Sequence, residues 1–264
     1  MNHRALTIMV MVSSLLLPGC GARQPQAKPP IASPLIHLRH RVARQDPSVQ
    51  FIAVRPLGRP QSYEPSHPTL FILTPDTPAK SLVVLYTAVV PQSSTRWTVD
   101  GYEASQSRPH QLILMSRSTI SLTSRGLTAS TRGIASSRPV LKFQLLPPEI
   151  RTGATWASPL PGQTGRSTIL GVANITTAAG HYQHCLVVFQ QNQFTGAAHQ
   201  HIVYVNFLAP HLGEVKQVSW WASGPIPQAF QLRRVVPLPD TQVLGHSAIP
   251  TAQSGWPLVA PWQS

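Results

Sequence analysis

The chain has 264 residues, which is enough for one domain with a sizeable core or for two small domains. Lys and Arg number 21 against 8 Asp and Glu, which gives a formal net charge of +13. The 27 prolines exclude a mainly helical protein, because proline breaks helix interiors. The two cysteines exclude a disulfide scaffold, and the 42% of hydrophobic residues excludes disorder throughout.

The amino terminus has the features of an export signal. The positive start Met1–Arg4 precedes the uncharged run Ala5–Leu17, which is shorter than the ~20 residues of a membrane-spanning helix. The run ends in Leu17-Pro18-Gly19-Cys20, which resembles a bacterial lipobox. We therefore expect residues 1–19 to be a lipoprotein signal peptide, with an ordinary secretory signal as the alternative.

The lipobox resemblance implies that Cys20 is the lipidation site. Its acyl chains, palmitate among them, would then anchor the protein in the lipid bilayer, because two or three chains hold where one does not. This predicts an extracytoplasmic protein on the outer face of the cell membrane, or on its periplasmic side where there are two membranes. Cys185 is left without a cysteine partner and lies in an apolar run, so we expect a buried, inert thiol there.

The remaining chain divides by composition into three parts. Residues 20–68 are rich in proline and basic residues, which predicts a tether. Residues 223–264 are predicted to form a proline-rich tail. Between them, residues 69–222 read as one β domain. The basic cluster His37–Arg44 has two interpretations that stay open: contact with an anionic lipid or wall polymer, or a solvated linker.

Short β-rich runs joined by turn residues predict an antiparallel sheet. We expect a hairpin turn at Asp100–Gly101 and a loop over Gly126–Arg138, which is rich in Ser, Thr, Arg and Gly. The expected strands are Thr69–Leu73, Ser81–Val90, Gln111–Met115, Thr119–Thr123, Pro139–Leu145, Ser167–Thr177, Cys185–Gln190, His201–Leu208 and Glu214–Trp220.

Three segments in the second half resemble a family of bacterial lipoproteins called TapB-like. They are Pro147–Trp156, Gly171–Val188 and Phe207–Lys216, and the best match spans 147–218. The sequence departs from the family pattern at Ala178, Phe207 and His211, the last standing where the family prefers glycine. The resemblance implies a fold related to LolA/LolB-like lipoprotein carriers. The expected fold is therefore mainly β, a single antiparallel curved sheet or incomplete β-barrel.

The carrier resemblance implies a concave sheet face with an apolar lining. The expected function is accordingly non-catalytic: binding of an apolar or amphipathic ligand, or a structural role at the envelope. Simple core packing is the alternative role for the candidate ligand-facing residues. These are Leu186, Val188, Val203, Val205 and Phe207.

A second candidate function is metal binding by histidines that are close in sequence. If Cys185–Gln190 pairs with His201–Leu208, we expect these histidines to approach one another, and imidazole is a good transition-metal ligand. Few carboxylates are available to support such ligands, so surface histidines are the alternative. The candidate ligands are His181, His184, His199 and His201.

Catalysis, cofactors and nucleic acid are not indicated. The sequence has no motif for a known nucleophile, phosphate loop or dinucleotide site, so we expect no enzyme and no cofactor. Acid/base catalysis would need two of the eight scattered acids to converge, which leaves an envelope enzyme with an unrecognised site as the third alternative. The arginines are dispersed, which does not favour nucleic acid. Scarcity of acids fits an acidic medium, because acid denaturation acts mainly through native carboxylates.

Replacing Cys20 tests the predicted anchor. We expect cells grown with radioactive palmitate to label the wild-type protein and to leave Cys20→Ala unlabelled, because the thiol is the acceptor. Equal labelling of the two proteins would contradict the lipobox interpretation. The variant Cys185→Ala serves as the control and should keep its label.

Overall fold

The computed structural model describes residues 34–53, 57–75, 83–105, 108–133, 141–158, 163–194, 201–221 and 228–238. A helix α1 (Pro34–Gln45) and a single 3-10 turn η1 (Pro60–Tyr63) accompany the strands. The strands of the first half are β1 (Gln50–Ile52), β2 (Thr69–Pro75), β3 (Val83–Ser93), β4 (Arg96–Ser105), β5 (Arg108–Thr123), β6 (Gly126–Gly133) and β7 (Leu141–Leu146). Those of the second half are β8 (Thr155–Ala157), β9 (Gln163–Thr177), β10 (Gly180–Phe194), β11 (His201–Ala209), β12 (Gly213–Trp221) and β13 (Gln228–Pro237).

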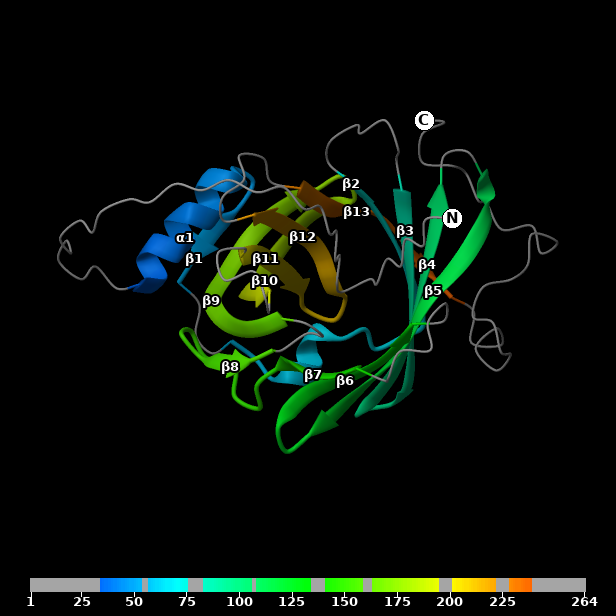
Figure 1. The fold of residues 1–264 in the computed structure, drawn as a ribbon, viewed down its shortest axis with the longest axis horizontal. Helices are drawn as coiled ribbons and strands as arrows, with labels where there is room; N and C mark the ends of the chain where they lie inside the picture. Colours follow the sequence, from blue (N-terminus) through cyan, green and yellow to red (C-terminus); the bar gives the residue numbers. More distant parts are fainter. Residues whose placement is uncertain are drawn as a thin grey trace.

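All the strands belong to one antiparallel sheet. Its order is β1-β9-β10-β11-β12-β13-β2-β3-β4-β5-β6-β7, with β8 paired to β9. Figure 1 shows that the sheet curls strongly, so that β6 and β7 lie opposite β11 and β12. The path ends at β1 and β7, and the sheet is not a closed barrel. The predicted fold class, a mainly β protein with a single curved antiparallel sheet, is confirmed.

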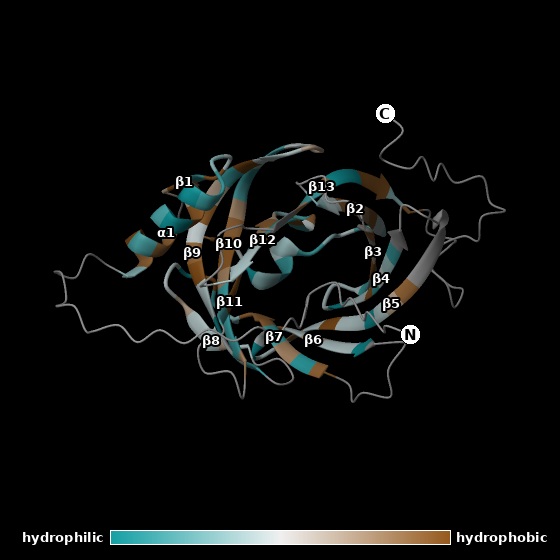
Figure 2. Ribbon diagram, turned by 45° about the horizontal axis from the view of Figure 1, so that its top comes forward, coloured by the Kyte–Doolittle hydropathy of each residue, from teal (hydrophilic) through white to brown (hydrophobic). Residues whose placement is uncertain are grey.

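Two-residue alternation gives the sheet two faces, because successive strand side chains point to opposite sides. In β11, Val203, Val205 and Phe207 point to the convex face, where Arg41 of α1 lies over the ring of Trp220 in the neighbouring strand β12. Asn206 and Leu208 point to the concave face. Figure 2 shows the hydrophobic runs of β9 and β10, whose buried side chains belong to the same hydrophobic core as those of β11.

Strand β13 joins the two halves of the sheet and was missed in the sequence, where its residues were assigned to the tail 223–264. It pairs with β12 through Gln228–Gln231 and with β2 through Phe230–Pro237. The register shifts between Leu232 and Arg234. That bulge breaks the alternation on which strand prediction relies.

Two further local predictions are wrong. Asp100 and Gly101 lie in the middle of β4 and form no hairpin turn. The Asp100 carboxylate accepts two hydrogen bonds from Arg117 on β5, at 2.7 and 2.8 Å, and this pairing lets a buried charge occupy a strand. The expected loop over Gly126–Arg138 contains strand β6, because its Ser and Thr side chains hydrogen-bond across the sheet, as Thr131 does to Ser118.

Part of the segment predicted to be a tether is packed onto the sheet. Leu35, Leu38 and Val42 recur at helical spacing and contact the core from α1. Arg39 donates from Nε to the Leu170 carbonyl at 2.6 Å, which uses one charge of the basic cluster within the fold. Beyond the helix, Asp46 forms a 2.8 Å ion pair with Lys216 of β12.

Candidate functional site

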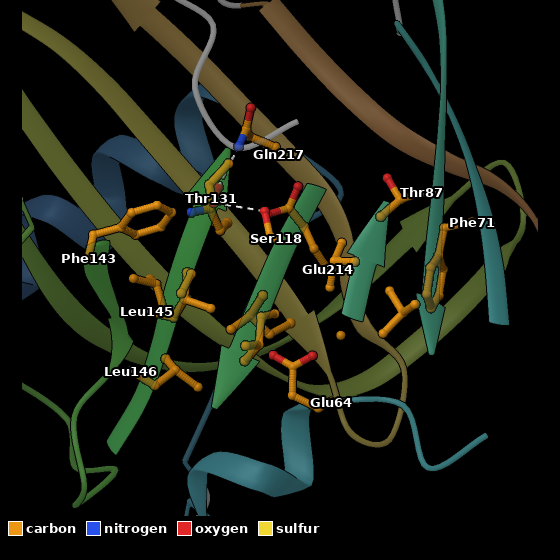
Figure 3. A pocket seen from close by; sticks show the side chains of 18 of the residues that line it. Glu64, Phe71, Thr87, Ser118, Thr131, Phe143, Leu145, Leu146, Glu214 and Gln217 are labelled. Carbon is orange, nitrogen blue, oxygen red and sulfur yellow. Dashed lines mark hydrogen bonds between the residues drawn. The ribbon is translucent and has the colours of Figure 1, made fainter. Parts of the chain in front are cut away.

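A cavity of about 140 Å³ lies on the concave face of the sheet, between β2–β7 on one side and β10–β13 on the other. Its apolar wall consists of aromatic and aliphatic side chains from both halves (Figure 3). These side chains are Phe71, Leu73, Leu85, Val89, Val99, Ile120, Ala129, Phe143, Leu145, Leu146, Val188, Leu208, Leu212 and Phe230. A mainly apolar cavity with a few polar groups is typical of small-molecule sites.

Most polar groups of the lining are already paired. Ser118 and Thr131 share a hydrogen bond of 2.7 Å, and Gln217 donates to Asn206 at 2.9 Å. Two buried oxygen atoms of the lining, Oγ1 of Thr87 and Oε2 of Glu214, have no hydrogen-bond partner among the described residues. A buried polar atom without a partner is costly, so these two atoms are the ones a ligand or water would satisfy.

Glu64 and Glu214 bring two carboxyl groups into the cavity (Figure 3). Burial and then the charge of Glu214 raise the pKa of Glu64 to about 8, and burial raises the pKa of Glu214 to about 8. Each residue keeps partial exposure, as a cavity lining does, although protein atoms surround the carboxyl groups closely enough to desolvate them. Both groups therefore favour the neutral form at neutral pH.

Hydrogen bonds on both sides hold Glu64 opposite Glu214. The Tyr63 hydroxyl donates to the Leu57 carbonyl, and the Trp97 indole of β4 donates to the Pro65 carbonyl at 2.9 Å. These bonds pin the residues that flank Glu64 in the chain. The site is therefore preorganised, because the surrounding backbone fixes the position of the carboxyl group.

The turn between β11 and β12 docks on the same segment. His211 donates its backbone N–H to the Ser62 carbonyl at 2.7 Å. Its φ of 61° lies in the left-handed region, which favours glycine over residues with a Cβ. Gly213, at φ 88°, follows, and a Cβ there would lie 3.4 Å from the Tyr63 carbonyl oxygen. The turn thereby places Glu214 beside the η1 segment.

Neither glutamate was predicted as a site residue. Glu64 and Glu214 are 150 positions apart; Glu64 stands in the predicted tether, and Glu214 stands in the segment Phe207–Lys216, whose resemblance points to fold and not to a site. The signal that could have found Glu214 is the scarcity of acids: it is the one carboxyl group between Glu149 and Asp240 in the sequence.

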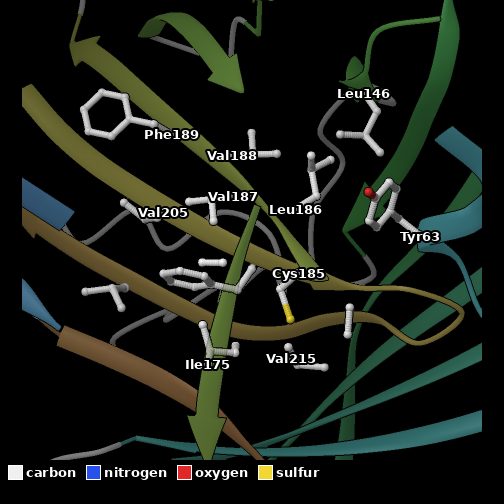
Figure 4. Close-up of a cluster of buried hydrophobic side chains, with 14 of the residues drawn as sticks. Tyr63, Leu146, Ile175, Cys185, Leu186, Val187, Val188, Phe189, Val205 and Val215 are labelled. Carbon is white, nitrogen blue, oxygen red and sulfur yellow. The ribbon is translucent and has the colours of Figure 1, made fainter. Parts of the chain in front are cut away.

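The predicted ligand-facing residues divide between the two faces of the sheet. In the register of β10 and β11, Leu186 pairs with Leu208 and Val188 pairs with Asn206. Leu186 and Val188 therefore belong to the concave face, like their partners. Val188 lines the cavity. The other three residues point to the convex core, which Figure 4 shows around Val205, Val187 and Phe189. They are Val203, Val205 and Phe207, all at most 1% exposed.

The predicted histidine cluster is not assembled by the register. His181 and His184 lie at the start of β10, whereas His201 pairs with Gln193 near its end. The expected approach is wrong because antiparallel pairing sends the start of β11 to the far end of β10. His199 lies outside the described residues. Within the described parts of the chain, no group of three or more His, Cys, Asp or Glu side chains could hold a metal ion.

The structure tests the prediction for one of the two cysteines. Cys20 lies outside the described residues, so its lipidation stays a prediction. Cys185 is a free thiol with no exposed surface (Figure 4). The predicted burial is confirmed, and burial also raises the thiol pKa to about 12, which disfavours the reactive thiolate. Among the described residues, no helix has the length and apolar character needed to cross a membrane.

Comparisons with known proteins give only a weak likeness of fold. No protein-family model and no curated protein matches the chain. A solved Bacteroides fragilis protein with a YmcC-like fold, provisionally named an exported protein, has a TM-score of 0.45 and 9% identity and covers 66% of this chain and 97% of its own. A Parabacteroides distasonis protein, provisionally named a lipoprotein, has a TM-score of 0.39 and 10% identity over 66% and 98%. Likeness at this level assigns no family, so the TapB-like and LolA/LolB-like resemblance stays a sequence prediction.

The glutamate pair predicts an unusual dependence of stability on pH. With pKa values near 8 in the folded chain against an ordinary 4.5, both carboxyl groups bind protons more tightly when folded. The free energy of unfolding should therefore fall as the pH rises from about 5 to 8, at about 1.4 kcal/mol for each pKa unit that is realised. We expect the unfolding midpoint to fall over this range by roughly 2–4 °C for each kcal/mol that is lost.

The matched control is the double variant Glu64→Gln/Glu214→Gln, which removes both titrating groups and keeps their shape. Its thermal unfolding midpoint should vary less between pH 5 and 8 than that of the wild type. Parallel profiles for the two proteins would show that the pair does not titrate as the cavity predicts.

Proposed function

We propose that the protein is a lipid-anchored envelope protein that binds an apolar or amphipathic small ligand, without catalysis, in the cavity of its curved sheet. The observation that carries this proposal is the cavity itself, with its wall drawn from both halves of the sheet. Acylated Cys20 would hold the protein at the lipid bilayer and place the cavity outside the cytoplasm. The proposal requires neither a cofactor nor nucleic acid.

The chemistry of the lining supports an apolar body for the ligand. Phe71, Phe143 and Phe230 and the surrounding leucines and valines would be removed from water by such a ligand. Burial of apolar surface contributes about 25 cal/mol per Å². A cavity of about 140 Å³ is close in size to one that accepts a benzene-sized group, so the buried part of the ligand is small.

A catalytic function has one observation in its favour, the convergence of Glu64 and Glu214. Acid/base chemistry needs positioned groups with shifted pKa values, and this pair has them. However, the described lining contains no histidine, cysteine, lysine or arginine that could act as a nucleophile or stabilise a developing negative charge. We therefore favour binding, and chemical conversion of a bound ligand would overturn this choice.

Filling the cavity tests the proposal. Val99 of β4 lines the cavity, so Val99→Phe places a larger side chain in the empty space. We expect calorimetric binding of 1-hexanol to the unacylated mature chain (residues 20–264 with Cys20→Ala) to weaken by about tenfold or more, because the space is occupied. The unfolding midpoint should change little.

The matched control is Thr98→Phe, which adds an aromatic ring at the neighbouring position, on the opposite face of β4. It should bind 1-hexanol like the wild type. Equal affinities for 1-hexanol in both variants and the wild type would contradict a ligand site in this cavity.

A further inference from the structure

We propose that the ligand of the cavity is a cationic amphiphile, whose amine group lies between Glu64 and Glu214 and whose apolar body lies against the aromatic wall. This inference deepens the proposed function and rests on it. It concerns the chemical class of the ligand, which the sequence analysis leaves open.

The charge of the lining is the first argument. Lys and Arg outnumber Asp and Glu by 21 to 8 in the whole chain. Among the described residues that line the cavity the balance is reversed: the charged types are Glu64 and Glu214, with no Lys, Arg or His. An anionic head group would meet carboxyl groups and no cation there. The lining therefore selects against anions and in favour of a positive group.

The second argument is the unsatisfied hydrogen-bonding capacity. Oε2 of Glu214 and Oγ1 of Thr87 are buried in residues that line the cavity, and neither atom has a hydrogen-bond partner within the described segments. Thr87 is only 9% exposed. A protonated amine has three N–H donors and no acceptor, which suits a set of carboxyl and hydroxyl oxygens. Hydrogen bonds between an ammonium group and carboxylates are stronger than those between neutral groups.

The third argument is the link between ligand charge and protonation. Burial in the cavity raises the pKa of both carboxyl groups to about 8, so they favour the protonated form at neutral pH. A bound ammonium group supplies the missing counter-charge, so a carboxyl group loses its proton to solvent as the ligand binds. Affinity for an amine should therefore increase with pH up to about 8, while affinity for a neutral alcohol should not.

Other titratable groups around the pair do not account for such a change. Tyr63 and Cys185 have pKa values of about 12, because both are buried. Lys216 and Asp46 pair with each other on the other face of β12. His211, in the turn before Glu214, has an exposed side chain and donates its backbone N–H to Ser62. Its variant His211→Asn is the control for histidine titration, since asparagine tolerates a left-handed φ.

The test compares hexylamine, 1-hexanol and hexanoate, which share one apolar chain, by calorimetry with the unacylated mature chain. At pH 7.5 we expect hexylamine to bind at least about tenfold more tightly than 1-hexanol, and hexanoate to bind most weakly. Between pH 6 and 8 the affinity for hexylamine should increase by about fivefold or more, with release of up to about one proton per ligand amine. Calorimetry in buffers of different ionisation enthalpy measures that release.

Variants locate the effect. Glu64→Gln and Glu214→Gln should lose the preference for the amine and its pH dependence, and should still bind 1-hexanol. The controls Glu149→Gln, at an exposed acid, and His211→Asn should behave like the wild type.

Four other results would each contradict one of these claims. If 1-hexanol binds as tightly as hexylamine in the wild type, the cation preference is wrong and the proposed apolar site survives. If hexanoate binds best, the charge argument is wrong. If none of the three binds, the proposed function fails together with this inference. If Ca²⁺ or Zn²⁺ alone displaces hexylamine, and the displacement is lost in Glu214→Gln, the pair is a metal site and the inference is overturned.

Discussion

The junction made by β13 is the constraint on which the cavity depends. This strand pairs with β12 on one side and β2 on the other, so it converts two runs of antiparallel strands into one curled sheet. Phe230 sits at this junction and lines the cavity, where it meets side chains from both halves. Without the junction, the concave faces of the two halves would not face a common space.

The curl has an electrostatic consequence. Two of the eight acidic residues are drawn into a space whose apolar walls disfavour charge, although the chain as a whole has a formal net charge of +13. The hydrogen bonds from Trp97 to Pro65 and from His211 to Ser62 hold the carboxyl groups in that space. Burial in this space raises the pKa values of both Glu64 and Glu214, and the charge of Glu214 raises that of Glu64 further. The same architecture explains why a counter-charged ligand would be favoured.

Sequence patterns predict the strands whose signal lies within a few consecutive residues. The apolar runs of β2, β3 and β9 to β12 are recognisable from composition and spacing, and the antiparallel sheet follows from them. Strand β13 escapes because its bulge interrupts the alternation, and α1 escapes because its short apolar stripe stands among prolines and basic residues. The basic cluster is partly explained in the fold: Arg39 binds the Leu170 carbonyl, and Arg41 lies over the Trp220 ring at 5.4 Å.

The candidate site could not be predicted in the same way. Glu64 and Glu214 meet because the η1 segment and the β11–β12 turn share a hydrogen bond, a contact between segments about 150 positions apart. The predicted ligand-facing residues are apolar, like the wall of the cavity. Alternate side chains of a strand point to opposite faces of the sheet, however, and Val203, Val205 and Phe207 point away from the cavity. Without the register of β10 and β11, sequence alone could not tell Val188 from Val205.

The most direct test of the account is to locate a bound ligand within the protein. Methyl-labelled NMR spectra of the unacylated mature chain, titrated with hexylamine, distinguish the two faces of the sheet. We predict chemical-shift changes for the methyl groups of Leu73, Val89 and Val188, which line the cavity, and little change for Val203 and Val205 in the convex core. Changes confined to the convex face, or no changes at saturating hexylamine, would contradict the claim that the curved sheet holds a ligand site.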